Sequence, residues 1–339
     1  MKAMVLCAGL GTRLRPLTER WPKPAVPLLG RPLLRYALAG LRAAGVREVG
    51  INTHHLSQVM EATARAECAR LGLGFTAVHE PVIQGTGGGI RGLRAFLEGG
   101  DALVVNGDVL FACDYAAVLA SHRASKAAAT MVLLPMPEGE TYNAVELDGA
   151  KRVRRIAGIG PAVPGLTRWH FSGVHVLSPR AWAAFGAGPE DVNRDVYPRL
   201  WAQGGEVHGA VVSGAWSDLG TPQRYLAAHQ QLLFGQVPLE AFPGASPFDE
   251  APARPALVRV HVHPSARLDG KVTGPAWVGP GAVVEAGASL GAGVSVGPSA
   301  TVRAGAQLNR CAVLDGAEVG PGLYEDRILA PGGVSLAAG

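Results

Sequence analysis

The chain has 339 residues, of which 48% are hydrophobic and 17% are charged. This length exceeds the usual size of one compact core, so we expect two domains, and the composition excludes wholesale disorder. The net charge is only +4, and no run of Lys and Arg is dense enough to predict a nucleic-acid partner.

The four cysteines, Cys7, Cys68, Cys113 and Cys311, occur singly. They show neither metal-ligand spacing nor a disulfide framework, so we expect reduced thiols and a cytoplasmic protein. The apolar stretch after Met1 is short and runs into Gly-rich sequence, so we do not expect it to be a signal peptide. No apolar run approaches the length that crosses a bilayer, so no membrane partner is expected.

Short apolar runs alternate with helical patterns over the first two thirds of the chain. The pattern predicts helices at residues 32–44 and 61–71, and strands at residues 4–8, 46–52, 73–79 and 102–106. This alternation predicts βαβ units and a mainly parallel, doubly wound sheet in an α/β domain over residues 1–234. Asp148-Gly149 after an apolar run predicts a hairpin.

The character of the sequence changes after this domain. Residues 235–256 are rich in Pro, Ala and Gly, which predicts a linker. Aliphatic residues then recur every six positions, at Val272, Val278, Val284, Leu290, Val296, Val302, Leu308 and Leu314. Such a repeat, with small residues between, predicts a parallel β-helix over residues 257–323, and residues 324–339 are left as a C-terminal tail.

A Gly-rich loop follows the first predicted strand. Gly9 and Gly11 allow the backbone to approach a ligand, and successive N–H groups can then bind phosphate oxygens. The loop matches neither the Walker A pattern nor the dinucleotide fingerprint. Arg13 and Lys23 add two cations, and the prolines between them stiffen the segment, which suits a triphosphate.

The same stretch resembles a known signature. Residues 8–18, Ala-Gly-Leu-Gly-Thr-Arg-Leu-Arg-Pro-Leu-Thr, and residues 21–24, Trp-Pro-Lys-Pro, resemble the sugar-1-phosphate nucleotidyltransferases. The resemblance implies a Rossmann-like domain. It also implies that Arg13 and Lys23 are catalytic, and that the triphosphate is bound by Ala8, Gly9, Gly11, Thr12 and Arg13.

Two carboxylates belong to further motifs. Asn106 and Asp108 come at the end of a buried strand, where open α/β sheets place their ligands, and we expect both to contact the nucleotide. Residues 216–222, Trp-Ser-Asp-Leu-Gly-Thr-Pro, resemble the late motif of the same family. The resemblance implies that Asp108 and Asp218 share a Mg²⁺ ion, which proteins commonly bind through few carboxylates and substrate phosphates.

Residues 79–89 resemble the base-recognition loop of the family, which implies that Glu80, Gly85 and Thr86 contact the nucleotide. Glu80 matches a position where uridylyl and thymidylyl members often carry Gln. A carboxylate only accepts hydrogen bonds, and guanine offers two adjacent donors, which favours GTP over UTP. The uridylyl alternative stays open.

The sugar site departs from the family pattern. Many relatives carry a Glu-Lys-Pro motif whose lysine helps to bind the sugar phosphate, but residues 152–161 contain no such lysine, and Arg154 or Arg155 are the possible substitutes. Residues 171–174, Phe-Ser-Gly-Val, resemble the segment beside the sugar. Candidate sugar ligands are Asn143, Glu146, Ser172 and Gly173.

The expected reaction joins an NTP and a sugar-1-phosphate into an NDP-sugar and releases pyrophosphate. The chain resembles mannose-1-phosphate guanylyltransferases that carry a C-terminal left-handed β-helix, which implies a homo-oligomer assembled through that domain. The catalytic domain also resembles N-acetylmuramate-1-phosphate uridylyltransferases. Two further alternatives are an acyltransferase, disfavoured because residues 272–339 contain no histidine, and an inactive regulatory subunit, disfavoured because Arg13, Lys23, Asp108 and Asp218 are all retained.

Overall fold

The structure is a computed structural model that describes residues 1–139, 142–250 and 259–338. The predicted linker and β-helix therefore fall partly outside the described residues. Contacts divide the chain into unit 1, residues 1–10 and 37–216, and unit 2, residues 11–36 and 217–339. The division differs from the boundary expected at residue 234, because residues 11–36 group with the C-terminal part of the chain.

Unit 1 is built on a nine-stranded sheet. Its strands are β1 (Lys2–Leu6), β4 (Glu48–Thr53), β5 (Gly74–His79), β6 (Ala102–Asn106), β8 (Ala129–Leu134), β9 (Ala144–Leu147), β10 (Val153–Ile156), β11 (Thr167–Leu177) and β12 (Val207–Val211). The main path runs β10-β9-β11-β6-β1-β4-β5, and β8 pairs with both β11 and β12. The strands β6, β1, β4 and β5 are parallel, whereas β11 runs antiparallel to β6. The expected mainly parallel α/β domain is confirmed.

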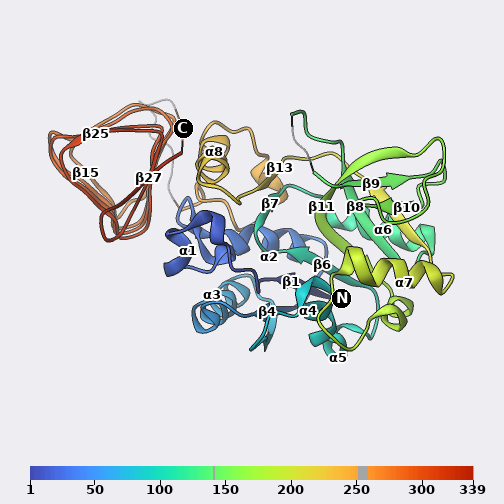
Figure 1. Cartoon of the computed structure of the whole chain (residues 1–339). Coiled ribbons are helices and arrows are strands. Elements are labelled where there is room, and N and C mark those ends of the chain that lie inside the picture. The colour runs from blue at the N-terminus through green and yellow to red at the C-terminus, as the bar shows by residue number, and fades with distance from the viewer. Residues whose placement is uncertain (140–141, 251–258, 339) are drawn as a thin grey trace. The chain divides into compact units, whose positions relative to one another are not determined.

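Helices surround this sheet in Figure 1. They are α2 (Leu33–Ala43), α3 (Ser57–Arg70), α4 (Gly85–Gly92), α5 (Arg94–Leu97), α6 (Tyr115–Ser125), α7 (Tyr197–Ala202), the 3-10 turn η3 (Pro179–Ala184) and a π-helical turn, η4 (Val192–Val196). Asp114 illustrates why they begin where they do, because its carboxylate accepts a hydrogen bond from the backbone N–H of Ala117 at 3.0 Å. The helices predicted at residues 32–44 and 61–71 correspond to α2 and α3.

The strand predicted at residues 4–8 ends earlier, at Leu6. The reason is a side chain: the N–H of Cys7 donates to Oδ1 of Asn52 at 2.9 Å and so leaves the ladder. The predicted hairpin is present, since β9 and β10 pair antiparallel. Its turn is held by Asp148, whose carboxylate accepts from the N–H groups of Ala150 and Arg152.

Unit 2 begins with short elements, η1 (Thr12–Leu14), α1 (Leu17–Arg20), η2 (Lys23–Ala25), β2 (Pro27–Leu28) and β3 (Arg31–Pro32), and continues with α8 (Pro222–Leu233) and η5 (Leu239–Ala241). The strand β7 (Val109–Phe111) lies in unit 1, and β13 (Trp216–Asp218) contains the boundary. The hydroxyl of Tyr225 on α8 donates to the carbonyl of Pro27. The ring of Tyr36 meets that of Phe242 edge-on, with centroids 5.4 Å apart. These buried contacts hold residues 27–36 to α8 and to the segment after it.

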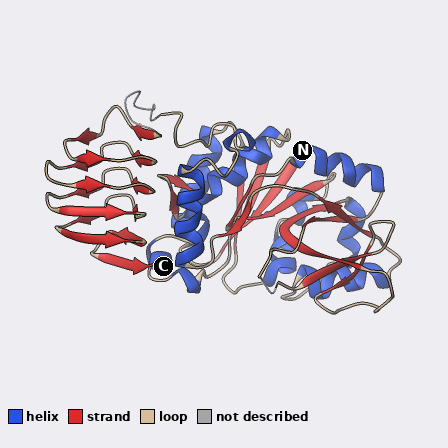
Figure 2. Cartoon of the chain, turned by 90° about the horizontal axis from the view of Figure 1, so that it is seen from above, coloured by secondary structure: helices blue, strands red, loops and turns tan. Residues whose placement is uncertain are grey.

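The rest of unit 2 is a three-faced parallel β-helix. One face holds β14 (Val260–Val262), β17 (Ala276–Val278), β20 (Val294–Val296), β23 (Ala312–Val313), β26 (Arg327–Ala330) and β27 (Val334–Ala337). The second holds β15 (Arg267–Leu268), β18 (Val283–Val284), β21 (Thr301–Val302) and β24 (Glu318–Val319). The third holds β16 (Lys271–Val272), β19 (Ser289–Leu290), β22 (Ala306–Asn309) and β25 (Gly322–Glu325). The coils form a triangle in Figure 1 and stacked rungs in Figure 2.

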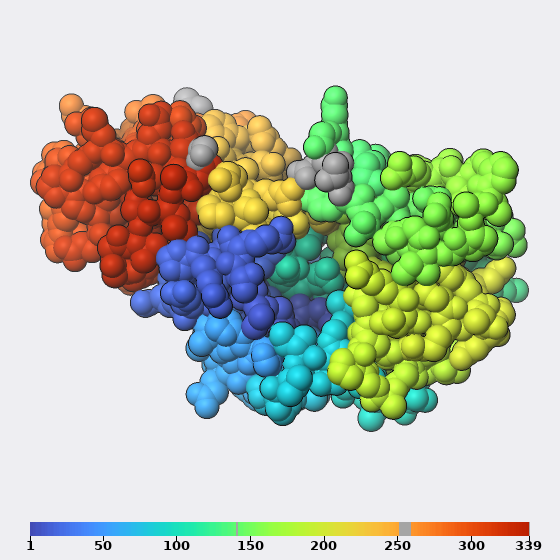
Figure 3. All heavy atoms as spheres, viewed as in Figure 1, coloured from blue at the N-terminus to red at the C-terminus, as the bar shows by residue number. Residues whose placement is uncertain are grey.

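The six-residue repeat is confirmed as the source of the β-helix core, and the parallel faces are consistent with the expected left-handed form. Most of the predicted aliphatic positions are buried, and the inward side chains form one core cluster. Figure 3 shows the outer surface of this domain in orange and red. The phase changes after Leu308, because Val313 rather than Leu314 is the residue that pairs with Val296 and joins the central cluster. Leu314 is buried one position beyond it, outside that cluster.

The segment expected to be a C-terminal tail contains strands. β25 begins at Gly322, β26 adds to the first face next to β23, and β27 returns antiparallel along β26. The strands therefore continue past residue 323. The antiparallel turn pairs an edge of β26 that would otherwise expose unpaired backbone groups.

Candidate active site

The second half of the Gly-rich loop is packed tightly inside unit 2. Gly11 has a positive φ of 61°, and a methyl group there would lie 2.9 Å from Cγ2 of Thr18 and 3.2 Å from Cβ of Lys23. The hydroxyl of Thr18 donates to the carbonyl of Gly11 at 3.0 Å. Only glycine meets both demands, so this position fixes the loop against the segment that carries Lys23.

The first half of the loop, in unit 1, is open. A methyl group on Gly9 would meet nothing within 4 Å, and Leu10 is 42% exposed. Backbone N–H groups in such an open Gly-rich turn can approach an anionic ligand closely. Ala8, Gly9, Gly11 and Thr12 therefore occupy a suitable phosphate-binding turn, although their contact with a nucleotide stays a prediction.

Arg13 and Asp218 are predicted from motifs about 200 residues apart, and both lie around Gly220. A Cβ atom on Gly220 would be 2.8 Å from a terminal nitrogen of Arg13 and 3.4 Å from Oδ1 of Asp218. The absence of a side chain at Gly220 is therefore what makes room for the Arg13 guanidinium beside the carboxylate. Lys23, in the same unit, is 6% exposed and lies in the 3-10 turn η2.

Asp218 has a charged partner that the sequence reasoning missed. Oδ1 of Asp218 accepts from Nη1 of Arg224 at 2.6 Å. Arg224 lies in the first turn of α8, where its N–H donates to the hydroxyl of Thr221 at 3.3 Å. The sequence did contain a signal for this pairing. The late motif ends in Thr-Pro, which is a typical helix start, and an arginine three residues after the Thr221 cap can reach back to the residues before the helix.

In unit 1, Asn106 and Asp108 follow β6 as expected. A methyl group on Gly173, whose φ is 87°, would lie 2.8 Å from Nδ2 of Asn106, so the glycine makes room for this amide. Burial raises the pKa of the Cys7 thiol, and the nearby negative charge of Asp108 raises it further. The Asp108 carboxylate thus lies close to the end of β1, where the Gly-rich loop begins.

A divalent cation fits the chemistry of these donors. Among the described residues, no group of three or more His, Cys, Asp or Glu side chains is placed to hold a metal. Magnesium does not require one, because it commonly keeps water and substrate phosphate among its ligands. Arg224 and the Gly220 N–H engage Oδ1 of Asp218, and Oδ2 makes no hydrogen bond within the described ranges, which leaves a carboxylate oxygen for a cation.

The Glu80 carboxylate has a structural role, because it links two neighbouring segments by hydrogen bonds. It is 5% exposed, Oε1 accepts from Nδ2 of Asn52 at 2.8 Å, and Oε2 accepts from the N–H of Gln84 at 2.9 Å. Because Asn52 also binds the N–H of Cys7, this chain of hydrogen bonds joins the end of β1 to the loop before α4. Both carboxylate oxygens are engaged, so a direct contact of Glu80 with a base stays a prediction.

The segment after this loop is tied to the π-helical turn. A methyl group on Gly85, whose φ is 72°, would lie 2.4 Å from the carbonyl oxygen of Glu190. The same carbonyl accepts from the N–H groups of Gly87 and Gly88, which are otherwise orphan donors at the start of α4. The hydroxyl of Thr86 donates to Oδ2 of Asp191 at 3.0 Å and accepts from the N–H of Val192 at 2.9 Å.

A cavity of about 310 Å³ lies in unit 1 beside this turn. Its lining is amide, aromatic, aliphatic and charged, from Tyr142, Asn143, Val145, Ile156, Ala157, His170, Phe171, Asp191, Asn193 and Arg194. Of the four candidate sugar ligands, only Asn143 lines it. Ser172 is buried, and its hydroxyl donates to the Val132 carbonyl at 2.8 Å. Oε2 of Glu146 lies 3.9 Å from Nη1 of Arg155.

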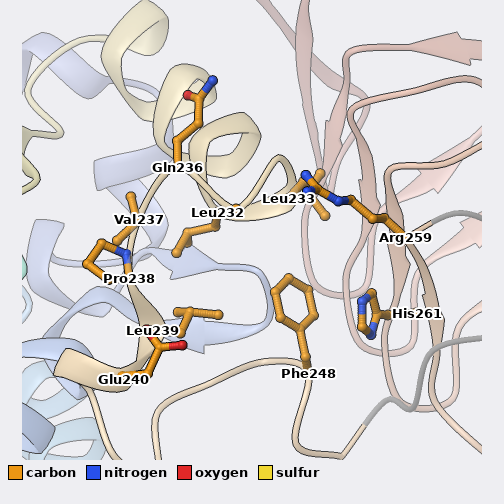
Figure 4. Close-up of a pocket in the computed structure, with 11 residues that line it drawn as sticks. Leu232, Leu233, Gln236, Val237, Pro238, Leu239, Glu240, Phe248, Arg259 and His261 are labelled. Atoms are coloured by element: carbon orange, nitrogen blue, oxygen red, sulfur yellow. The ribbon is translucent and has the colours of Figure 1, made fainter.

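A larger cavity of about 550 Å³ lies in unit 2, between the end of α8, the segment after it and the first β-helix strand (Figure 4). Its walls combine apolar and polar side chains, with the stacked rings of Phe248 and His261 on one side, centroids 4.3 Å apart. None of the predicted phosphate-binding residues lines it. We therefore place the candidate site at the Gly-rich loop and the cavity of unit 1.

The fold and these groups are typical of an α/β protein that acts on a phosphate-bearing ligand. A parallel sheet ends in a Gly-rich turn, an arginine and a carboxylate meet around one glycine, and a polar cavity opens beside a second Gly-rich segment. The four cysteines are buried free thiols. In the described part of the chain, no helix is both long and apolar enough to cross a membrane.

Comparison with known proteins specifies the class. The family model described as nucleotidyl transferase matches residues 2–234, so the chain belongs to the nucleotidyl transferase family. It is 33% identical over 327 residues to a mannose-1-phosphate guanylyltransferase of Mycobacterium tuberculosis, covering 96% of this chain and 83% of that protein. It is 26% identical to a UTP–glucose-1-phosphate uridylyltransferase of Synechocystis sp., covering 95% and 85%.

Among solved structures, the chain is similar to that of HddC from Yersinia pseudotuberculosis complexed with GMP-PN. The TM-score is 0.56 at 21% identity, over 68% of this chain and 98% of that one. At this identity the likeness establishes the fold alone.

Proposed function

We propose that this enzyme transfers a guanylyl group from GTP to mannose-1-phosphate or a similar hexose-1-phosphate, giving the GDP-sugar and pyrophosphate. The observation that carries the reaction is the grouping of Arg13 and Asp218 around Gly220, with Gly11 packed on Lys23 in the same unit. The preference for guanine and mannose rests on the mannose-1-phosphate guanylyltransferase that matches over 96% of this chain.

In the proposed reaction, an oxygen of the sugar phosphate attacks the α-phosphorus of GTP in line. The bond from that phosphorus to the bridging oxygen breaks, and pyrophosphate leaves with the electron pair. Negative charge gathers on the phosphoryl oxygens, and Arg13, Lys23 and the amides of the Gly-rich loop offset it. Lys23 is nearly buried, so its charge acts in a medium that screens it less than water does.

Asp108 and Asp218 would hold a divalent cation, for which we propose Mg²⁺, and when bound it supplies further positive charge to the phosphates. Arg224 holds Asp218 in place through Oδ1. Asn143 and the cavity that it lines would bind the sugar. Asn106, Gly85 and Thr86 would contact the nucleotide, as would Glu80, either directly or by shaping the loop.

The experiment is a matrix of GTP, UTP, ATP and dTTP against mannose-1-phosphate, glucose-1-phosphate and N-acetylmuramate-1-phosphate, with pyrophosphate release measured in the presence of Mg²⁺. We expect the highest kcat/KM for GTP with mannose-1-phosphate, and no turnover with EDTA. Turnover with UTP alone would overturn the guanylyl assignment and favour uridylyl transfer, as in the Synechocystis relative. No pyrophosphate from any pair would overturn the reaction itself.

We also propose a cytoplasmic homo-oligomer that assembles through the β-helix. Support comes from the buried free cysteines, which suit a reducing compartment, and from Leu323 on β25, which is 79% exposed on an otherwise regular face.

A further inference from the structure

The first face of the β-helix carries buried side chains on its outer side as well as in its core. In β17 and β20, Val278 and Val296 point into the central cluster, and the neighbouring Trp277 and Ser295 alternate to the outside. These two outward residues are paired in register, and they are only 3% and 1% exposed. Another part of unit 2 must therefore cover this side of the face.

The hairpin of β2 and β3 covers Trp277. Leu29 and Gly30 form its two-residue turn, with positive φ values of 49° and 66°. A Cβ atom on Gly30 would lie 2.6 Å from Cη2 of Trp277 and 2.9 Å from Cδ of Pro298. The tip of the hairpin thus rests against the indole ring, and any side chain at Gly30 would push the two apart.

The indole ring is itself held in one place. Its Nε1 donates to the carbonyl of Pro247 at 3.1 Å, and a Cβ atom on Gly279 would lie 2.6 Å from Cη2 on the same ring. Beside it, Nη2 of Arg31 on β3 lies 3.0 Å from Oε1 of Glu250. The hairpin therefore packs against a fixed aromatic surface and is held there by an ion pair.

This hairpin follows directly after the turn that carries Lys23. The N–H of Val26 donates to the Lys23 carbonyl at 3.2 Å, and the Val26 carbonyl accepts from the N–H of Leu33 at 3.1 Å. The prolines that flank Lys23 restrict the backbone between the two. Because so few rotatable bonds separate them, a displacement of the hairpin should also displace Lys23.

We propose that Trp277 is a positioning residue for the transfer reaction, because it holds the β2–β3 hairpin in place and thereby fixes the position of Lys23. This inference rests on the proposed function, in which Lys23 offsets charge in the transition state. It gives the β-helix a role in the reaction itself, separate from assembly.

The test compares the steady-state kinetics of GTP and mannose-1-phosphate in variants of the full chain. We expect Trp277→Ala to lower kcat about 10-fold, because a small misplacement of a catalytic group is costly. The KM for either substrate should change less than about 3-fold, since the lost interaction belongs to the transition state. Trp277→Phe keeps a ring near Gly30 and should recover most of the loss.

A double variant shows whether Trp277 acts through Lys23. In a Lys23→Ala protein, adding Trp277→Ala should lower the residual kcat by less than about 2-fold, because coupled residues are not additive. The matched control is Leu308→Ala, which removes a buried side chain from the third face of the same β-helix. At a temperature where it is folded, it should keep the kcat of the parent protein.

Hydrogen exchange followed by mass spectrometry gives a readout that does not depend on activity. We expect the amides of residues 25–33 to exchange faster in Trp277→Ala than in the parent or in Leu308→Ala. Unchanged exchange there would overturn the proposal.

A parent-like kcat in folded Trp277→Ala, or an equal loss with and without Lys23, would also overturn it and leave the proposed function standing. A parent protein that releases no pyrophosphate with any substrate pair would overturn the proposed function and the role in the reaction with it. Faster exchange at residues 25–33 would in that case still show that Trp277 holds the hairpin.

Discussion

At the scale of single residues, the site depends on positions where glycine leaves room for another group. Gly11 admits the Thr18 and Lys23 side chains, and Gly220 admits the Arg13 guanidinium beside Asp218. In each case the functional group comes from elsewhere in the sequence. A sequence motif therefore identifies the glycine, but only the side chain packed against it in the fold explains why a methyl group is excluded there.

Replacing Lys23 with Ala should lower kcat by about 100-fold or more, the scale of losing one donor that stabilises transition-state charge. The measurement is pyrophosphate release with saturating GTP and mannose-1-phosphate. Because Lys23 is almost buried, the thermal midpoint of the variant should be recorded as well. Lys271→Ala, at an exposed position on β16, is the control and should keep full activity. Near-normal turnover in a folded Lys23→Ala protein would contradict the role.

At the scale of elements, the β-helix is stabilised by the aliphatic residues that its strands point inward. Leu308 on β22 is 3% exposed and lies in the central cluster, whereas Leu323 on the neighbouring β25 is 79% exposed. We expect Leu308→Ala to cost about 2–5 kcal/mol through lost burial and the cavity left behind. Leu323→Ala should stay within about 0.5 kcal/mol of the parent protein. Urea unfolding followed by circular dichroism compares the two, and equal costs would contradict the assigned core.

The packing of α8 on the β-helix should be sensitive to acid. His229 on α8 is buried, its Nδ1 lies 3.0 Å from the Ser295 hydroxyl, and burial lowers its pKa to about 3. Below about pH 6.5 the unfolded chain binds a proton at this residue that the folded chain does not, so stability falls as pH falls. Asp315, whose pKa burial raises to about 6, opposes this between about pH 4 and 6. The buried His175, with a pKa lowered to about 3, adds to the loss in unit 1.

The urea midpoint of the parent protein should therefore drop between pH 7 and pH 5. His229→Gln, which cannot be protonated, should show a smaller drop, by up to about 1.4 kcal/mol per pH unit. His79→Gln, at an exposed position on β5, is the control and should follow the parent. An unchanged pH slope in His229→Gln would show that the ring is protonated equally in both states.

At the scale of the whole molecule, each of the two units is built from two separate stretches of the sequence. Residues 11–36 belong with the C-terminal unit, where Tyr36 packs on Phe242 and Arg35 donates to the Gly244 carbonyl at 3.2 Å. A chain cut after Phe234 would lose these partners of the segment that carries Lys23. A chain cut after Glu250 keeps them and lacks the strands of the β-helix.

We expect a protein of residues 1–250 to have a smaller oligomeric state than the full chain and to keep some guanylyl transfer. Light scattering coupled to size exclusion gives the mass, and pyrophosphate release gives the activity. Leu323→Lys in the full chain is the finer test, because it places a charge on the exposed β25 position without removing a domain. An unchanged mass in both proteins would refute assembly through the β-helix.

The sequence by itself determined the features that local patterns encode. Strand and helix alternation gave the parallel sheet, as at residues 102–106, which are β6 as predicted. The six-residue repeat gave the β-helix, and contiguous motifs marked Gly11, Arg13 and Lys23. These predictions are correct because each pattern that they rest on is formed by residues close together in the sequence.

Only the tertiary structure decided which of those groups meet. In the structure both carboxylate oxygens of Glu80 accept hydrogen bonds, and Asp218 pairs with Arg224. Val313 and not Leu314 lies in the β-helix core, and Arg194 lines the cavity of unit 1. The physical reason is that hydrogen bonds, ion pairs and packing join residues far apart in sequence. A motif shows which side chain is available, whereas the fold determines which partner it finds.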